Sequence, residues 1–120
     1  MTSFNLPLPP SVNALYKNIP KECGGGRAKT RAYEDWITLA RSELRKQRAR
    51  PILVPVKIEY HVREKSRIDL GNHEKPLTDL LVFHGVIEND SKKYVRGILL
   101  EWSSEVPIGV RVTIKPTGEA

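Results

Sequence analysis

The residues best suited to chemistry lie between Arg67 and Asp90. Asp69 and Asp90 stand just before and just after a segment with the pattern of one helix. A helix separates its ends by about 1.5 Å per residue, so the two carboxylates meet only if the chain folds back after Gly85. In a basic chain, acids that are brought together suggest a divalent metal ion held against phosphate. Such a site is typical of a metal-dependent nuclease.

Hydrolysis of a phosphodiester needs a nucleophilic water and neutralisation of the charge on the phosphoryl oxygens. Mg²⁺ provides both when one or two carboxylates hold it together with waters and substrate oxygens. Aspartate is a suitable ligand because its carboxylate is short and hard and only accepts hydrogen bonds. Clustered acids also repel one another, which raises their pKa values until a cation arrives. A fold that gathers such acids therefore suggests a function.

Each of these residues also has an ordinary structural explanation. An aspartate before a helix is usually a cap or a first-turn charge, and an Asn-Asp pair after a helix is usually a turn. Taken separately, Asp69 and Asp90 indicate little. Lys75 could simply form an i,i+4 pair with Asp79, which would be worth only about 0.3–0.5 kcal/mol.

Length, charge and cysteine content limit the classes of protein. The chain has 120 residues, which favours one compact domain with a small core. Its formal net charge is +6 and its pI is about 9.6, as expected of a nucleic-acid-binding protein but not specific to one. Cys23 is the only cysteine, so an internal disulfide is excluded. Apolar runs of signal-peptide or membrane-spanning length are absent, so we expect a soluble cytoplasmic protein.

The first half of the chain has the pattern of two strands around a helix. Alternation over 4–8 predicts a short edge strand that prolines then end. A basic loop follows, in which glycines 24–26 are more often a flexible connection than a phosphate cradle. An apolar face at helical spacing predicts a helix over about 32–48, and alternation predicts a strand over 54–62. Basic residues crowd the last turns of this helix. They would either interact favourably with the negative end of its dipole or contact a DNA backbone.

The second half predicts one helix and two further strands. Asn72 is a plausible N-cap and Gly85 a good stop for a helix over about 72–84. Strands are predicted over 94–102 and 108–114. The whole chain therefore reads as a single α+β domain, with a mixed sheet of about four strands and two main helices.

Two motifs together narrow the function. One reads Arg67-x-Asp69-x-x-Asn72-x-x-Lys75-x-x-x-Asp79-x-Leu81, then Gly85 and Asp90, and the other reads Leu8-Pro9-Pro10-Ser11-x-Asn13-x-x-Tyr16. Both, in this order, resemble motifs of the RusA family of Holliday junction resolvases. The resemblance covers nearly the whole chain. The matching residues are highly specific over 67–90 and moderately specific over 8–16. In the last strands the resemblance is weak.

The resemblance implies a fold, an activity and a partner. RusA-like proteins are small homodimeric, Mg²⁺-dependent endonucleases, with Mn²⁺ as an alternative ion, and many are encoded by prophages. They cut four-way DNA junctions symmetrically in recombination and repair. Asp69 and Asp90 match two essential acids of the family, and Lys75 matches its functionally important lysine. A C2 homodimer would offer two identical sites to the two equivalent strands of a junction.

One position departs from the family pattern, because Gly71 stands where the family has a third aspartate. Glu74 could replace it, since an acid one turn into a helix can point back towards the N-terminal end. Asp79 or Glu88 could do so instead, or the protein could be a non-catalytic dimeric binder of branched or single-stranded DNA. We favour Glu74. The expected catalytic residues are then Asp69, Asp90, Lys75 and Glu74, of which the three acids would bind the metal.

Further residues are expected to contact DNA or a second subunit. Tyr16, Tyr94 and Trp102 could stack on unpaired bases, although core or dimer contacts are the commoner role of aromatic residues. The edge-prone N-terminal strand and the strand at 98–102 are candidate dimer interfaces. A third interpretation is a small interaction module whose charge serves only solubility. It predicts no salt-dependent affinity for DNA, whereas the affinity of a phosphate binder should fall steeply with added salt. The residues expected to bind DNA are Arg63, Lys65, Arg67, Asn72, Lys75, Lys92, Lys93, Asn13 and Lys17.

Overall fold

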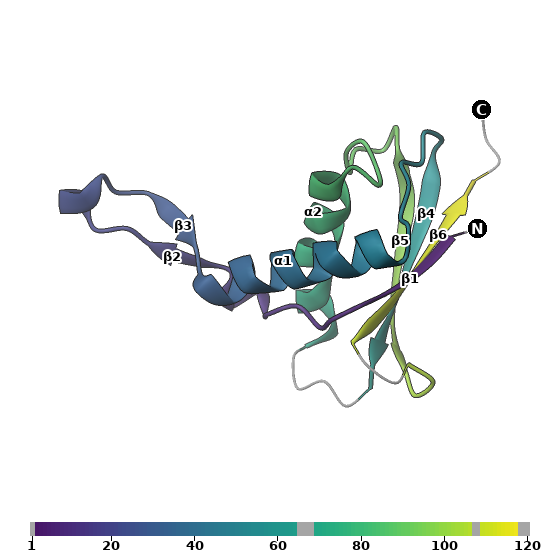
Figure 1. The fold of residues 1–120 in the computed structure, drawn as a ribbon, viewed down its shortest axis with the longest axis horizontal. Coiled ribbons are helices and arrows are strands. Elements are labelled where there is room, and N and C mark those ends of the chain that lie inside the picture. Colours follow the sequence, from purple (N-terminus) through teal and green to yellow (C-terminus); the bar gives the residue numbers. More distant parts are fainter. Residues whose placement is uncertain (1, 65–68, 107–108, 118–120) are drawn as a thin grey trace.

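A four-stranded mixed sheet forms the base of the fold in the computed structural model, which describes residues 2–64, 69–106 and 109–117 (Figure 1). Its strands lie in the order β1 (Thr2–Leu6), β6 (Val110–Pro116), β4 (Val56–Arg63) and β5 (Val95–Ser103). The β1/β6 and β6/β4 pairs are antiparallel, whereas β4 and β5 are parallel. The predicted α+β class and the edge position of the first strand are confirmed.

Two helices cover one face of this sheet. Parallel neighbours need a crossover, and the crossover from β4 to β5 contains α2 (Glu74–His84). Helix α1 (Arg31–Lys46) buries the apolar face predicted for it, from Tyr33 to Leu44. Only every second residue of β4 and β6 is buried, so the opposite face of the sheet is open to solvent.

A two-stranded hairpin projects from the body as an arm (Figure 1). It consists of β2 (Tyr16–Asn18) and β3 (Arg27–Lys29), with the short 3₁₀ helix η2 (Lys21–Cys23) near its tip. Glycines 24–26 all have positive φ, between 69° and 106°, and reverse the chain there. The arm helps to explain a radius of gyration of 15.1 Å, against about 13.6 Å for an ordinary domain of this length. The prediction of a loop without strands here is wrong. Strands of three residues are too short to show an alternation of polar and apolar residues in the sequence.

Element boundaries differ from the predicted ones by a few residues. The first strand ends at Leu6 rather than at 8, and α1 covers Arg31–Lys46 rather than 32–48. Val54 is exposed and lies before β4, which begins at Val56. Ile108, expected in the last strand, lies outside the described residues. Neither helix in the described part of the chain has the length and apolarity that crossing a bilayer requires.

Candidate acidic site at the start of helix α2

A short 3₁₀ helix, η3 (Leu70–His73), leads from Asp69 into α2. The carbonyl of Asp69 accepts a hydrogen bond from the N–H of Asn72 at 3.0 Å. His73 is fully buried, with its Nδ1 3.0 Å from the carbonyl oxygen of Leu70 and its ring edge-on to Trp102 at 5.7 Å. The segment between Asp69 and α2 is therefore anchored to β5 by packing that the sequence pattern did not indicate.

Helix α2 begins two residues later than expected. Asn72 belongs to η3, so its prediction as the N-cap of α2 is wrong, and His73 takes that place without a side-chain cap. Pro76 becomes the third residue of the helix. Proline is tolerated there because N–H groups of the first turn have no partner within the helix. The late start places the side chain of Glu74 at the beginning of the helix.

Glu74 is the acid whose environment is most perturbed. Partial burial raises its pKa most, and the negative charges of Asp79 and Asp90 raise it further. A hydrogen bond with Thr78 and the charge of Lys75 act in the opposite direction. The buried hydroxyl of Thr78 also lies 2.7 Å from that of Tyr60. The carboxyl of Glu74 is thus linked through Thr78 to the sheet.

Asp90 reaches this site because the chain reverses after α2. Gly85 adopts φ +85°, and the next N–H, of Val86, donates to the carbonyl of Leu81 at 2.9 Å. The turn after it is closed by a bond from the N–H of Ser91 to the Asn89 side chain at 2.9 Å. Asp90 lies exposed on this turn and acts on Glu74 through its charge. Asp69, exposed before η3, is not among the charges that shift the Glu74 pKa.

Lys75 supplies a positive charge beside these acids. Its Nζ lies 3.3 Å from Oδ2 of Asp79, one turn further along α2, and its side chain is 58% exposed. The hydrogen bond and charge of Asp79 raise the pKa of Lys75, so it stays protonated at neutral pH. An exposed pair of this kind contributes only about 0.3–0.5 kcal/mol. Lys75 can therefore exchange Asp79 for a phosphate at little cost.

The donor chemistry suits a hard cation held partly by water. Over the residues that the structure describes, no three acidic, histidine or cysteine side chains are grouped tightly enough to enclose an ion. Mg²⁺ does not need such a cage, since it usually keeps several waters and one or two carboxylates. Asp79 and Asp90 raise the pKa of Glu74 through their negative charges, and a bound Mg²⁺ would neutralise that negative charge. These residues fit an open Mg²⁺ site and not a closed one.

The residues expected to contact DNA are spread over several elements. Lys92 and Lys93 are exposed one residue beyond Asp90, after Ser91, and the Nζ of Lys93 lies 5.4 Å from the ring centre of Tyr94. Asn13 is exposed in the 3₁₀ helix η1 (Val12–Ala14), Lys17 is exposed on the arm, and Arg63 is exposed at the end of β4. Asn72 is half-buried in η3. Lys65 and Arg67 lie outside the described residues.

Sequence reasoning missed Thr78 as a partner of Glu74. The two residues are four apart on one helix, so their i,i+4 spacing was a usable signal. Their link to Tyr60 could not be read in this way, because it depends on how α2 packs against β4.

No protein-family model matches the chain, and no curated protein matches it at a significant level. The function of this protein is therefore inferred from its residues and their geometry.

Proposed function

We propose that this protein is a RusA-type, Mg²⁺-dependent endodeoxyribonuclease that cuts four-way DNA junctions in recombination and repair. The observation that carries the proposal is the environment of Glu74. On a chain of net charge +6, its partly buried carboxyl is opposed by Asp79 and Asp90 and has a lysine beside it. Mutual repulsion of acids destabilises a fold, and perturbed acids of this kind are typical of functional sites.

Each residue of the site has a role in this proposal. Asp69, Glu74 and Asp90 would hold Mg²⁺, which when bound provides an activated water and neutralises phosphoryl charge. The ammonium group of Lys75 would hold a phosphoryl oxygen of the strand to be cut. Asp79 would keep Lys75 in place until the phosphate arrives, because the pair is exposed and weak. Lys92 and Lys93 would bind the backbone on the Asp90 side.

A homodimer would give the symmetry that paired cleavage of a junction needs. Strand β5 is an edge of the sheet, and it exposes Ile98, Leu99 and Trp102. An edge strand with unpaired backbone groups and apolar side chains favours association with another chain. We therefore prefer β5 to the other edge, β1, as the dimer interface.

A second candidate function is a dimeric binder of branched or single-stranded DNA that does not cut. The observation in its favour is that, in the described parts of the chain, no three metal-binding side chains form a group, and Gly71 offers no carboxylate. The binder would keep the basic surface and Lys75 but would have no use for Mg²⁺.

Cleavage of a synthetic four-way junction, with and without Mg²⁺, separates the two candidates. For the nuclease we expect paired, symmetric nicks that need Mg²⁺. Asp90→Asn and Asp69→Asn should reduce the rate at least about 100-fold, because each removes a ligand and changes little else. Glu105→Gln, at an exposed acid after β5, is the control and should cut normally.

The same junction assayed for binding completes the experiment. Tight binding that weakens steeply with added salt, without cutting in Mg²⁺ or Mn²⁺, would show that the binder is the correct function. Absence of salt-dependent binding would contradict both candidates and leave an interaction module.

A further inference from the structure

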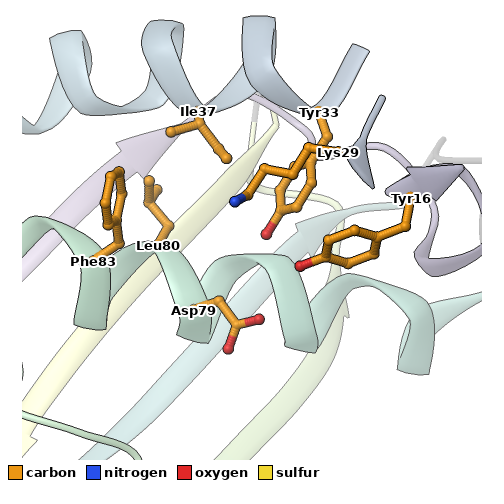
Figure 2. Close-up of a pocket in the computed structure, with 7 residues that line it drawn as sticks. All are labelled: Tyr16, Lys29, Tyr33, Ile37, Asp79, Leu80 and Phe83. Atoms are coloured by element: carbon orange, nitrogen blue, oxygen red, sulfur yellow. The ribbon is translucent and has the colours of Figure 1, made fainter. Parts of the chain in front are cut away.

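A cavity of about 180 Å³ lies where the base of the arm meets the two helices (Figure 2). Its lining comes from β2, β3, α1 and α2, so it exists because the base of the hairpin, at Tyr16 and Lys29, lies against the helices. A water molecule occupies about 30 Å³ of the liquid, so this space corresponds to about six waters or one small heteroaromatic ring system. Each of the two sequence motifs contributes one residue to its lining, Tyr16 and Asp79, but the motifs alone did not indicate a cavity.

Aromatic rings make up much of the wall. Tyr16 and Tyr33 meet edge to face, with ring centres 5.7 Å apart. Tyr33 is stacked in turn on Trp36 at 6.2 Å, and the indole N–H of Trp36 donates to the carbonyl of Pro7 at 2.9 Å. The position of the Tyr33 ring is therefore fixed by Trp36, which packs against it and is itself anchored to Pro7. Such preformed aromatic surfaces suit a flat ligand, because little ordering is needed when it binds.

A further aromatic ring, that of Phe83, lies at the rim of the cavity and is largely exposed to solvent. Phe83 is 64% exposed, although it is among the most apolar side chains of α2. The guanidinium of Arg41 lies 4.7 Å from its ring centre. Aromatic side chains with an arginine beside them are a common platform for nucleic-acid bases. Ile37 and Leu80 complete the apolar part of the lining.

The polar groups of the cavity are a cation, an anion and two hydroxyls. Figure 2 shows the hydroxyls of Tyr16 and Tyr33 close together, with the ammonium of Lys29 on one side of them and the carboxylate of Asp79 on the other. Burial, together with a hydrogen bond between its hydroxyl and that of Tyr16, raises the pKa of Tyr33 to about 12, so both hydroxyl groups of this pair can take part in hydrogen bonds. Asp79 can accept further hydrogen bonds, since Lys75 occupies only part of its carboxylate. The lining thus offers donors on one side and an acceptor on the other.

Two positive charges lie beside the cavity on the side of the arm. Arg27 stacks over Tyr16, 4.8 Å from its ring centre, and Lys29 follows on β3. Asp79 lies five residues along α2 from Glu74, which is about 7.5 Å along the helix axis. A nucleotide whose base entered the cavity would place its phosphates among these cations, beside the acidic site.

We propose that this cavity binds one unpaired nucleobase of DNA, stacked against Tyr16 and Phe83 beside the buried ring of Tyr33, with an exocyclic amino group donating to Asp79. Bases that carry an amino group (adenine, cytosine and guanine) fit this lining. Thymine does not, because two carbonyl oxygens flank its single N–H and would face the carboxylate. The inference rests on the proposed function in that both concern DNA, but it requires no cleavage.

The test measures binding alone, in a metal chelator so that nothing is cut. Short single-stranded oligonucleotides of deoxycytidine, of thymidine and of abasic sites carry the same phosphates but different bases. We expect the cytidine oligonucleotide to bind about 5–50-fold more tightly than the abasic one, the effect of one stacked base, and the thymidine oligonucleotide to lie between them. Fluorescence anisotropy measures all three.

Two pocket variants and a control make the test specific. Phe83→Ala, at an exposed position, and Tyr16→Leu should weaken cytidine binding to the abasic level and leave abasic binding unchanged. Leu53→Ala also removes an exposed apolar side chain (81% exposed), away from the cavity, and should change nothing. Asp79→Asn should reduce the preference for cytidine over thymidine, since an amide also offers a donor to the carbonyls of thymine.

The outcomes distinguish this inference from the proposed function. Equal binding of all three oligonucleotides, or equal losses for all three in Phe83→Ala, would overturn the base pocket even if junctions are cut normally. A base preference that Phe83→Ala abolishes would support it even if junctions are never cut. Failure to bind any DNA would overturn both. If Tyr16→Leu fails to fold, Phe83→Ala still decides the question.

Discussion

The carboxylates on the open face of the sheet and those around the start of α2 lie in contrasting settings. On the sheet each of the two acids has a basic partner on a neighbouring strand. Glu59 of β4 lies 2.8 Å from the ammonium of Lys115 on β6, and Glu101 of β5 lies 3.9 Å from His61, its register partner on β4. Such cross-strand pairs stabilise a sheet modestly. They need no explanation beyond the fold.

Around the start of α2, Glu74 has two other acids as neighbours. Glu74 has a raised pKa because it is partly buried and faces the charges of Asp79 and Asp90. Its hydrogen-bonding partner, Thr78, is neutral, and Lys75 is already paired with Asp79. The difference teaches that the surroundings of a carboxylate indicate its role better than its residue type or its place before a helix. Paired acids serve the fold, whereas opposed acids are candidates for binding a cation.

The largest expected difference between the two settings is in catalysis. Glu74→Ala should reduce junction cleavage at least about 100-fold if this residue replaces the missing third aspartate. Glu59→Ala, the matched change on the sheet, should leave the rate within about twofold, because it removes only a partly exposed ion pair with Lys115. Full cleavage by Glu74→Ala would exclude Glu74 as the substitute ligand. The measurement is the single-turnover rate on a four-way junction at saturating Mg²⁺.

A second prediction adds an acid instead of removing one. Gly71 has a negative φ, and a Cβ placed there meets no atom within 4 Å, so Gly71→Asp should fold normally. The added carboxylate should lower the Mg²⁺ concentration for half-maximal cleavage about 10-fold, since each charged ligand strengthens binding of a hard cation.

Gly97→Asp is the control for this substitution. It adds the same charge on β5, where a Cβ would meet only Lys57 at an ordinary 3.8 Å. It should leave the Mg²⁺ dependence unchanged. An equal effect of both substitutions would mean that net charge alone, and not a site near Gly71, sets the response to Mg²⁺.

The smallest expected effect concerns stability and pH. The folded state binds the Glu74 proton more tightly than the unfolded chain does, because its pKa is raised above the ordinary 4.5. The stabilisation is therefore fully present below pH 4.5 and is lost as pH rises through the raised pKa. In a metal chelator, Glu74→Gln should match the wild-type melting temperature at low pH and exceed it by on the order of 2 °C at neutral pH.

Glu59→Gln provides the opposite case on the sheet. It removes a favourable charge from an ion pair, so its melting temperature should fall slightly or not at all at neutral pH. The difference in melting temperature between each variant and the wild type, measured at every pH, removes the contribution of the other titrating groups. A lower melting temperature for Glu74→Gln at neutral pH would show that the Thr78 and Lys75 contacts outweigh the repulsion.

The sequence allowed much of the scaffold to be predicted. The apolar face of α1, the alternation in β4 and β6, the edge position of β1 and the stop at Gly85 all follow from local patterns, and the structure confirms them. The arm was not predicted, because its strands are too short to show a period and its glycines resemble those of a linker. The start of α2 was misplaced, because Asn72 has the chemistry of a cap but belongs to η3.

The sequence by itself determined which residues could do chemistry: the acids, the lysine between them and the excess of positive charge are properties of single side chains. Periodicity likewise determined most helices and strands, since these depend on near neighbours. Only the tertiary structure decided that the charge of Asp90 acts on Glu74, that Thr78 links Glu74 to Tyr60, and that the base of the arm and both helices line a cavity. These relations join residues far apart in the chain, and they depend on chain reversal and on burial, which local preferences do not contain.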